Sequence, residues 1–574
     1  MSEKVFFPYG ISNFAQIVTQ NYVYVDKTAY LELFEKSQEK FVIYLRPRRF
    51  GKSLFLSLLE HYYDLNRKNE FESLFAKYYI GKNPTAFANS YRILFFNFSA
   101  VDTTSYQKSY EGFLDEVRSK IKAFQRYYEV FDKDDFQDII SQKSPEKILR
   151  NFCNLYPDRK TKVFLLIDEY DHFANEILLR NIDEFKKSVS LNGYVRKFYE
   201  AIKNGTQLGV IDRFFITGVS PITLDSLTSG FNIVKNLTHH KEFEVMMGFS
   251  EKEVKDLLSL VLKNKRKQSQ VLKDLQSYYN GYNFYPMSRE NIYNSDMVLY
   301  FLDNFKQQGQ YPRQMLDPNI APDYGKLKAM FQVANWQANV SVLEEVLETG
   351  IVESEQIYQF SFEKAFGRKE FVNFLFYLGN LTFGKIYPNG MIAFKIPNKV
   401  ISELYWQYYS EILQNQAHLQ NLQDDVQRAV SEMSLSGNSQ KFFSLIERLL
   451  QNLSNRDFRQ FDEKYVKLAM MAYLVQANIF DVRSEREMSG GGYLDLRLFI
   501  KPNNPFKHHQ FVIELKYLKK EQTYLLSETL QEAKNQILSY YRQDKVLQSK
   551  EMLHLLVVVV VKDKIFVEEV EKSL

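Results

Sequence analysis

Residues 41–53 of this chain read FVIYLRPRRFGKS. An aliphatic run, Phe41 to Leu45, leads directly into a basic loop that ends in Gly51-Lys52-Ser53. Residues 54–59 read LFLSLL and continue as a helical pattern. A strand, a glycine-containing loop and a helix in this order predict one unit of a parallel α/β sheet.

The loop itself has the chemistry of a phosphate-binding P-loop. Gly51 lets backbone amides approach a phosphate, Lys52 can reach the outer phosphates, and Ser53 can ligate Mg²⁺. Arg46 stands where the general pattern has its first glycine, so the turn departs from that pattern. Taken alone, the Gly-Lys-Ser tripeptide is a weak signal and is more simply interpreted as a basic turn on a solvated surface.

Two further strand candidates end in polar residues that fit the same ligand. Residues 163–167 lead into Asp168 and Glu169, and residues 213–216 lead into Thr217. At a strand's carboxyl end, Asp168 can hold Mg²⁺ through water while Glu169 orients the water that attacks the γ-phosphate. Thr217 could sense that phosphate. We therefore expect ATP and Mg²⁺ as cofactors.

The order of strand-like and helical segments along the chain predicts three domains. Short aliphatic runs alternate with helical patterns over residues 1–250, which indicates a parallel sheet flanked by helices. Ser250 and Glu253 have the spacing of a capping box that opens a helix. Residues 251–430 are mostly helical and are expected to form a lid and connector. Residues 431–574 return to an α/β order of helices, three strand-like runs, a helix and the aliphatic strand 555–561.

The last domain carries a candidate metal site. Asp495 lies on the run 493–500, and Glu514 and Lys516 lie on the next run, 510–515 and onward. Two carboxylates can hold one or two Mg²⁺ ions, and Lys516 can steer or activate the water that attacks phosphorus. Residues two apart on a strand share a face, so Glu514 and Lys516 are expected to point the same way. An acid and a lysine at this spacing also occur on many ordinary half-exposed strands.

Other polar residues of this domain have weaker claims. Glu463 and Glu485 could be additional ligands, although a solvated acid is the simpler interpretation of each. Phosphate contacts could come from Lys519, Lys520 and Lys534. The adjacent pair His508 and His509 is interpreted as surface residues, because neighbours on a strand point to opposite faces.

Several stretches together resemble the predicted AAA-ATPase-like family, whose members commonly carry a C-terminal PD-(D/E)XK nuclease domain. They are 10–14, 24–28, 46–53, 167–171, 217–220 and 280–282, with the Gly-Tyr-Leu-Asp and Ile-Glu-Leu-Lys stretches of the C-terminal part. In that family RPRRFGKS is the usual loop, so the missing glycine is a shared trait. We expect the nucleotide at Arg49, Gly51, Lys52, Ser53, Asp168 and Thr217.

The resemblance of the C-terminal part also implies that one of its helices contributes to the active site. Gln536 and Tyr540 lie four residues apart on one helix face, and this pattern is similar to the helix that completes the active site of exonuclease-like members. Tyr493 stands where many relatives have arginine, and Gly490 to Gly492 precede Asp495.

Composition sets the outer limits of these expectations. The 574 residues are 45% hydrophobic with a net charge of +4, so any nucleic-acid footprint must be local. Cys153 is the only cysteine, which excludes a disulfide framework within the chain. No secretory or membrane-spanning stretch is apparent, and a cytoplasmic setting is expected.

The leading hypothesis is an ATPase that gates Mg²⁺-dependent cleavage of nucleic acid, with DNA favoured over RNA and a homo-oligomer left open. The alternative is a nucleotide-switched module that binds DNA or protein through an inactive nuclease fold.

Overall fold

The computed structural model describes residues 5–572, apart from 190–191, 223–230, 289, 361–365, 420–421, 455–461, 488–492, 503, 505 and 507. The chain divides into two compact units. The first comprises Met1–Gln310, Leu316–Val342 and Ile351–Asn398, and the second comprises Tyr311–Met315, Leu343–Gly350 and Lys399–Leu574.

The first unit is built on a five-stranded sheet in the order β2-β3-β4-β1-β5, in which every neighbouring pair is parallel. The strands are β1 (Phe41–Leu45), β2 (Arg92–Asn97), β3 (Val163–Asp168), β4 (Ile211–Gly218) and β5 (Lys235–Asn236). All six residues of β3 are buried, as expected for a parallel sheet covered on both faces. The parallel sheet predicted from the sequence is therefore confirmed.

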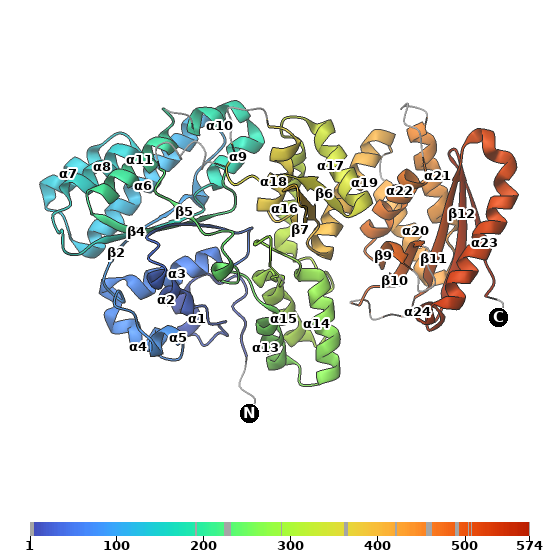
Figure 1. Cartoon of the computed structure of the whole chain (residues 1–574), viewed down its shortest axis with the longest axis horizontal. Coiled ribbons are helices and arrows are strands. Elements are labelled where there is room, and N and C mark those ends of the chain that lie inside the picture. The colour runs from blue at the N-terminus through green and yellow to red at the C-terminus, as the bar shows by residue number, and fades with distance from the viewer. Residues whose placement is uncertain are drawn as a thin grey trace. The chain divides into compact units, whose positions relative to one another are not determined.

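Helices cover both faces of this sheet, with α6, α8 and α11 on one side and α2 and α3 on the other (Figure 1). The helices of this part are α1 (Phe14–Thr19), α2 (Ala29–Lys36), α3 (Lys52–Tyr63), α4 (Phe71–Phe75), α5 (Tyr79–Lys82), α6 (Tyr106–Tyr128), α7 (Lys133–Ser141), α8 (Pro145–Leu155), α9 (His172–Arg180), α10 (Ile182–Val189) and α11 (Tyr194–Gln207).

The middle of the chain is mainly helical, as predicted. Its helices are α13 (Glu251–Val261), α14 (Lys265–Tyr279), α15 (Ser295–Gln308), α16 (Ala321–Phe331), α17 (Trp336–Thr349) and α18 (Arg368–Tyr377). Ser250 and Glu253 form the expected capping box at the start of α13.

A small antiparallel sheet, β6-β8-β7, interrupts the helices and was not expected from the sequence. Its strands, β6 (Ile351–Ser354), β7 (Thr382–Ile386) and β8 (Ile392–Lys395), are only four or five residues long, which is too short for a clear alternation. The one local signal is Asn389-Gly390 between β7 and β8, with Gly390 at φ 83°, because this dipeptide favours hairpin turns.

The second unit contains a mixed sheet in the order β13-β12-β11-β10-β9. Strands β9, β10 and β11 are antiparallel neighbours, β11 and β12 are parallel, and β13 returns antiparallel to β12. The strands are β9 (Phe480–Glu487), β10 (Tyr493–Ile500), β11 (Gln510–Leu518), β12 (Leu553–Val561) and β13 (Lys564–Glu569). The edge strand β13 adds to the strands that the sequence indicated.

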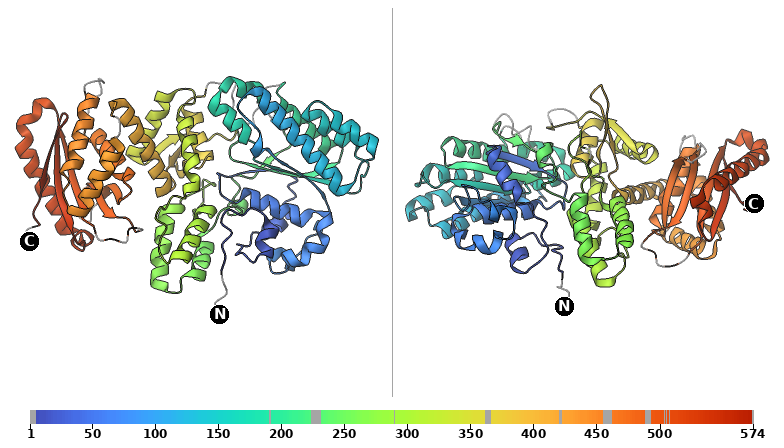
Figure 2. Two further views of the ribbon diagram at one scale, coloured as in Figure 1. Left: turned by 180° about the vertical axis from the view of Figure 1, so that it is seen from behind. Right: turned by 60° about the horizontal axis from the view of Figure 1, so that its bottom comes forward.

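Figure 2 shows α23 along one face of this sheet, with α21 and α22 on the opposite face. The helices are α19 (Lys399–Ala417), α20 (Leu422–Ser436), α21 (Gln440–Ser454), α22 (Glu463–Gln476), α23 (Leu526–Gln543) and α24 (Lys545–Gln548). Within the described residues, no helix is both long and apolar enough to cross a bilayer.

Candidate functional sites

The phosphate loop joins the end of β1 to the start of α3. Gly51 is the N-cap of α3 at φ 89°, a left-handed conformation that favours glycine. The hydroxyl of Ser53, in the first turn of α3, donates a 2.6 Å hydrogen bond to Oδ2 of Asp168 at the end of β3. The structure therefore brings together the two side chains predicted to hold Mg²⁺.

The side chain of Lys52 turns toward the backbone of its own loop. Its Nζ donates to the carbonyl oxygens of Arg46 at 3.1 Å and Pro47 at 3.0 Å, and the side chain is buried. Two carbonyl acceptors, rather than a carboxylate, hold this ammonium in place at the centre of the loop.

The two acids after β3 point in different directions. Asp168 is buried, and this burial raises its pKa to about 6, although the hydrogen bond from Ser53 works against the shift. Glu169 has φ 51°, and its side chain lines the pocket in front of the loop. The turn at Glu169 thus separates Asp168, the acid expected to hold Mg²⁺, from a carboxylate that faces the pocket.

Arg46 is an internal brace of the loop. The guanidinium is 1% exposed and lies 4.3 Å from the ring centroid of Tyr44 and 4.2 Å from that of Phe284. It donates to the carbonyl oxygens of Leu45, Thr238 and Glu244. The arginine that replaces the first glycine of the general pattern therefore supports the loop from behind.

Thr217 is fully buried at the end of β4, and its hydroxyl donates to the carbonyl oxygen of Tyr44 at 2.9 Å. A contact between Thr217 and the γ-phosphate stays a prediction, and it would require this hydroxyl to turn.

Sequence reasoning missed the role of Asp171, the last residue of the Asp-Glu-Tyr-Asp stretch. Its buried carboxylate accepts from the backbone N–H groups of Val219 and Ser220 at 3.0 and 2.7 Å, and from the side chain of Asn175 at 2.6 Å. A Cβ on Gly218 would lie 2.2 Å from this carboxylate. Asp171 thereby fastens the loops after β3 and β4 to one another.

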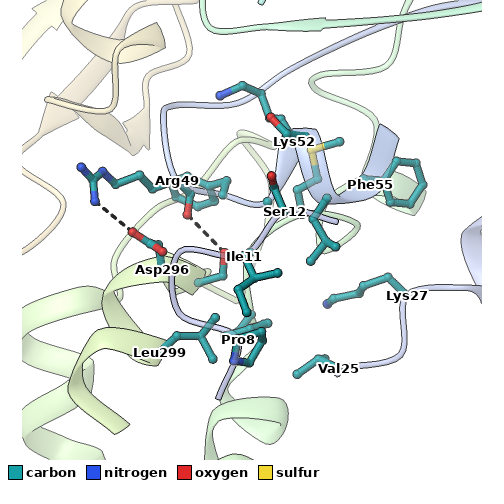
Figure 3. A pocket seen from close by; sticks show the side chains of 18 of the residues that line it. Pro8, Ile11, Ser12, Val25, Lys27, Arg49, Lys52, Phe55, Asp296 and Leu299 are labelled. Atoms are coloured by element: carbon teal, nitrogen blue, oxygen red, sulfur yellow. Dashed lines mark hydrogen bonds and ion pairs between the residues drawn. The ribbon is translucent and has the colours of Figure 1, made fainter. Parts of the chain in front are cut away.

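A pocket of about 580 Å³ lies in front of the loop (Figure 3). Lys52, Ser53 and Glu169 supply its polar end. Arg49 and Asp296 also line the pocket, and it has an apolar wall made by Pro8, Ile11, Val23, Val25, Met246, Met247, Phe249 and Leu257. Lys27 also lines the pocket and is held by Glu253 at 2.7 Å. A polar end and an apolar wall fit a ligand with a charged tail and a flat ring system.

The predicted acids and lysine of the second unit converge on one face of its sheet. Arg497 pairs with Val512 across β10 and β11, so Asp495 and Glu514 share a face by alternation. Lys516 Nζ lies 2.6 Å from Oε1 of Glu514 and 4.0 Å from Oδ2 of Asp495. Asp495 Oδ2 also accepts from the backbone N–H of Leu515 at 2.9 Å.

Glu514 has the features of a metal ligand. It is fully buried, and its Oε2 has no hydrogen-bond partner among the described residues. Burial, and then the charge of Asp495, raise the pKa of Glu514 to about 7. Although burial works against the charged form of Lys516, its hydrogen bond to Glu514 and the surrounding acids raise the pKa of the lysine. The cluster therefore has an excess of acid that a cation would offset.

The side chain of Glu463 is not the fully solvated acid that the sequence suggested. This residue begins α22 and is partly buried, and burial followed by the charge of Asp495 raises its pKa, while Lys516 and Lys467 lower it. The side chain thus lies within electrostatic reach of the cluster. Even so, in the part of the chain that the structure describes, no three His, Cys, Asp or Glu side chains could hold a metal alone. A cation here would need ligands from water or from substrate.

Gln536 and Tyr540 lie on α23, which packs against β11 and β12. Gln536 Nε2 donates to the hydroxyl of Tyr540 at 2.8 Å, and Tyr540 packs in a cluster with Val512. The helix thus covers the face that carries Glu514. The side chains of Glu485 and Tyr493, and residues Gly490 to Gly492, lie outside the described residues.

The basic residues near this site differ in their surroundings. Lys519 and Lys520 are exposed, whereas Lys534 is ion-paired with Glu568. His509 is not a simple surface residue, because its Nδ1 lies 2.6 Å from Nε2 of His554.

The sheet, the loop and the acids at the strand ends define the first unit as a P-loop nucleotide-binding fold, and the second unit contains an α/β nuclease fold. Residues 8–228 match the family model described as predicted AAA-ATPase, and residues 461–570 match that of the PD-(D/E)XK nuclease superfamily. The two matches agree with the order expected from the sequence, an AAA-ATPase-like region followed by a PD-(D/E)XK nuclease-like domain.

A curated relative, an uncharacterized protein encoded in the vnfD 5′ region of Azotobacter chroococcum, is 26% identical over 303 residues. The match covers 51% of this chain, and the chain spans about half the length of that relative, 51%.

Three solved structures are similar at low identity. A Walker-type ATPase of Pyrococcus abyssi is 12% identical with a TM-score of 0.37, covering 66% of this chain and 94% of that chain. Cdc6p from Pyrobaculum aerophilum is 14% identical with a TM-score of 0.26, covering 70% and 96%. The ORC2 protein of Aeropyrum pernix is 10% identical with a TM-score of 0.32, covering 69% and 98%.

Proposed function

We propose that this chain binds and hydrolyses ATP, and that its nucleotide state gates Mg²⁺-dependent phosphodiester cleavage of nucleic acid, with DNA the favoured substrate. We further propose that the chain divides into domains at residues 1–250, 251–430 and 431–574, that it acts in the cytoplasm, and that it can form a homo-oligomer.

The polar and apolar groups that line the pocket support ATP as its ligand. The triphosphate would lie at the end lined by Lys52 and Ser53, and the base would lie against the apolar wall. Mg²⁺ held between Ser53 and Asp168 would neutralise phosphate charge. Glu169, which faces the pocket, would orient the attacking water.

The observation that carries the nuclease proposal is the convergence of Asp495, Glu514 and Lys516. The buried Oε2 of Glu514, which lacks a partner among the described residues, fits a cation ligand. A divalent cation held by Asp495 and Glu514 would offset the charge of the scissile phosphate and lower the pKa of a bound water. Lys516 would hold the attacking water and stabilise charge on the phosphate.

This geometry favours the nuclease over the alternative of an inactive binding module. A module that only binds nucleic acid has no need of two acids and a lysine within 4.0 Å, and it could let these side chains splay apart. Binding by itself would be served by exposed lysines such as Lys519 and Lys520.

The test is a cleavage panel of single-stranded, double-stranded and circular DNA and of RNA, run with Mg²⁺ and with ATP, ADP or no nucleotide. We expect cleavage that requires Mg²⁺ and is lost in Asp495→Ala, Glu514→Ala and Lys516→Ala, while ATP hydrolysis persists in all three. Metal affinity should fall in the two acid variants and survive in Lys516→Ala. Absence of cleavage of every substrate by the wild-type chain would overturn the nuclease proposal.

A further inference from the structure

The side chain of Arg49 points toward Asp296 at the start of α15 (Figure 3). Arg49 follows Arg48 in the loop at φ 69°. Its Nη1 lies 3.0 Å from Oδ2 of Asp296 and 3.2 Å from Oδ2 of Asp317. Its Nη2 donates to the carbonyl oxygen of Asn319. An arginine expected to contact nucleotide is therefore engaged elsewhere in this structure.

The acid partners are tied to the N-terminal segment as well. The carboxylate of Asp317 is fully buried and accepts a 2.6 Å hydrogen bond from the hydroxyl of Tyr9. Asn319 donates from its side chain to the same hydroxyl at 2.8 Å. We call Tyr9, Arg49, Asp296, Asp317 and Asn319 the clasp, because these residues join four separate segments.

A second attachment holds the backbone of the loop. At the start of α15, the side chain of Ser295 and the backbone N–H of Asp296 donate to the carbonyl oxygen of Arg49 at 3.2 and 3.3 Å. Asn294 donates to the carbonyl oxygen of Arg48 at 3.4 Å. These bonds do not involve the guanidinium, so they can persist when the side chain of Arg49 moves.

We propose that Arg49 is a nucleotide-responsive residue that exchanges Asp296 and Asp317 for the outer phosphates of a bound nucleoside triphosphate. This inference rests on the proposed binding of ATP in the same pocket. Both Arg49 and Asp296 line that pocket, so a triphosphate there would compete with the acid for the same guanidinium. Phosphate oxygens accept charge-assisted hydrogen bonds from a guanidinium as carboxylate oxygens do, so a triphosphate can replace the two carboxylates that Nη1 now contacts.

The exchange would free a defined segment. Once Arg49 leaves, Asp317 and Asn319 keep Tyr9 but lose the cation that neutralises a buried carboxylate, which is a costly arrangement. Asp317 lies two positions after the stretch Tyr311–Met315, which belongs to the second compact unit. Release of the clasp would thus act on a chain segment that leads directly into the unit with the nuclease fold.

The test measures nucleotide affinity of the full chain by calorimetry, with Mg²⁺ and either ADP or a slowly hydrolysed ATP analogue. Asp296→Asn and Asp317→Asn remove competitors for Arg49, so each is expected to bind the triphosphate about tenfold more tightly, with a smaller change for ADP. Asp303→Asn, farther along α15, is the matched control and should leave both affinities unchanged.

Hydrogen exchange supplies an independent readout. The backbone N–H of Asn319 donates to Asp317 at 2.9 Å, and its exchange should be faster with the triphosphate analogue than with ADP in the wild-type chain, but equal in Arg49→Ala. Unchanged or weaker triphosphate binding in Asp296→Asn, together with unchanged exchange at Asn319, would overturn the clasp while leaving ATP binding intact. A folded wild-type chain that binds no nucleotide would overturn the proposed function as well.

Discussion

At the scale of single residues, the guanidinium of Arg46 fills the space behind the phosphate loop. It lies between two aromatic rings and satisfies carbonyl groups of Thr238 and Glu244, which are 192 and 198 residues away in the sequence. A glycine at this position would give the loop conformational freedom. Arg46 instead holds the loop in shape through its contacts with distant segments.

Arg46→Ala should therefore destabilise the first unit by about 3 kcal/mol, because the buried carbonyls lose their donor and a cavity opens. Arg46→Gly restores the general motif and is expected to be at least as damaging. Denaturant unfolding measures both, with the exposed Arg126→Ala on α6 as the control. Wild-type stability in Arg46→Gly would contradict the role of a brace.

Glu463 offers a second prediction at this scale. Since three acids surround Lys516, Glu463→Gln removes repulsion from Asp495 and should leave the stability equal or slightly higher. If Glu463 helps to hold the cation or its water, cleavage should nevertheless fall by roughly tenfold, about 1.4 kcal/mol in the barrier. Cleavage rates at saturating and limiting Mg²⁺ measure this. A cleavage rate equal to that of the wild type at both Mg²⁺ concentrations would show that Glu463 takes no part in cleavage.

At the scale of elements, a histidine pair joins the residue just before β11 to the neighbouring strand β12. His509 Nδ1 lies 2.6 Å from His554 Nε2, and His554 Nδ1 lies 2.6 Å from Glu569 on β13. The backbone N–H of His509 also donates to the carbonyl oxygen of Ser434 at the end of α20. Protonation of both imidazoles would leave this contact without an acceptor and would place two cations side by side.

The second unit should consequently lose stability as the pH falls. Burial, followed by the charge of His554, lowers the pKa of His509 in the folded chain below its value of 6.5 in the unfolded chain, and His508 acts in the same direction while Glu569 opposes it. The unfolded state then binds more protons, so stability is complete above pH 6.5 and is lost as the pH falls through the folded pKa.

Thermal unfolding of the wild-type chain and of His509→Gln between pH 8 and pH 5 measures this effect. The variant should show a flatter pH dependence, whereas His418→Gln, at an exposed position of the same unit, should follow the wild type. If the unfolding temperatures of His509→Gln and the wild type depend on pH in the same way, the histidine pair does not cause the loss of stability at low pH.

At the scale of the whole molecule, one chain carries both the proposed ATP site and the proposed nuclease site. Glu169→Gln keeps the shape of the pocket-facing side chain but removes the charge that would orient water. We expect ATP binding to persist while hydrolysis falls on the order of 100-fold, so that the effect of ATP on cleavage lasts instead of decaying.

Lys52→Ala is the matched comparison, because it should lose nucleotide binding altogether and make cleavage insensitive to ATP. Time courses of cleavage with limiting ATP separate the two variants. An identical ATP response in wild type, Glu169→Gln and Lys52→Ala would mean that the nucleotide does not gate the nuclease.

The sequence by itself determined the features that depend on neighbouring residues. The strand, loop and helix around Gly51 follow from local order, the acids after β3 follow from the end of a hydrophobic run, and the shared face of Glu514 and Lys516 follows from strand alternation. The parallel sheet followed in the same way, because each of its longer strands is a recognisable aliphatic run.

Only the tertiary structure decided which distant side chains meet. Arg49 finds Asp296 and Asp317 across 247 and 268 residues, and no local pattern marks either acid as its partner. Glu463 reaches the cluster of Asp495 because α22 packs on the sheet, although its own surroundings in the sequence resemble those of any exposed helix start. Local periodicity fixes the direction in which a side chain points from its own element, whereas its neighbours depend on how the elements pack.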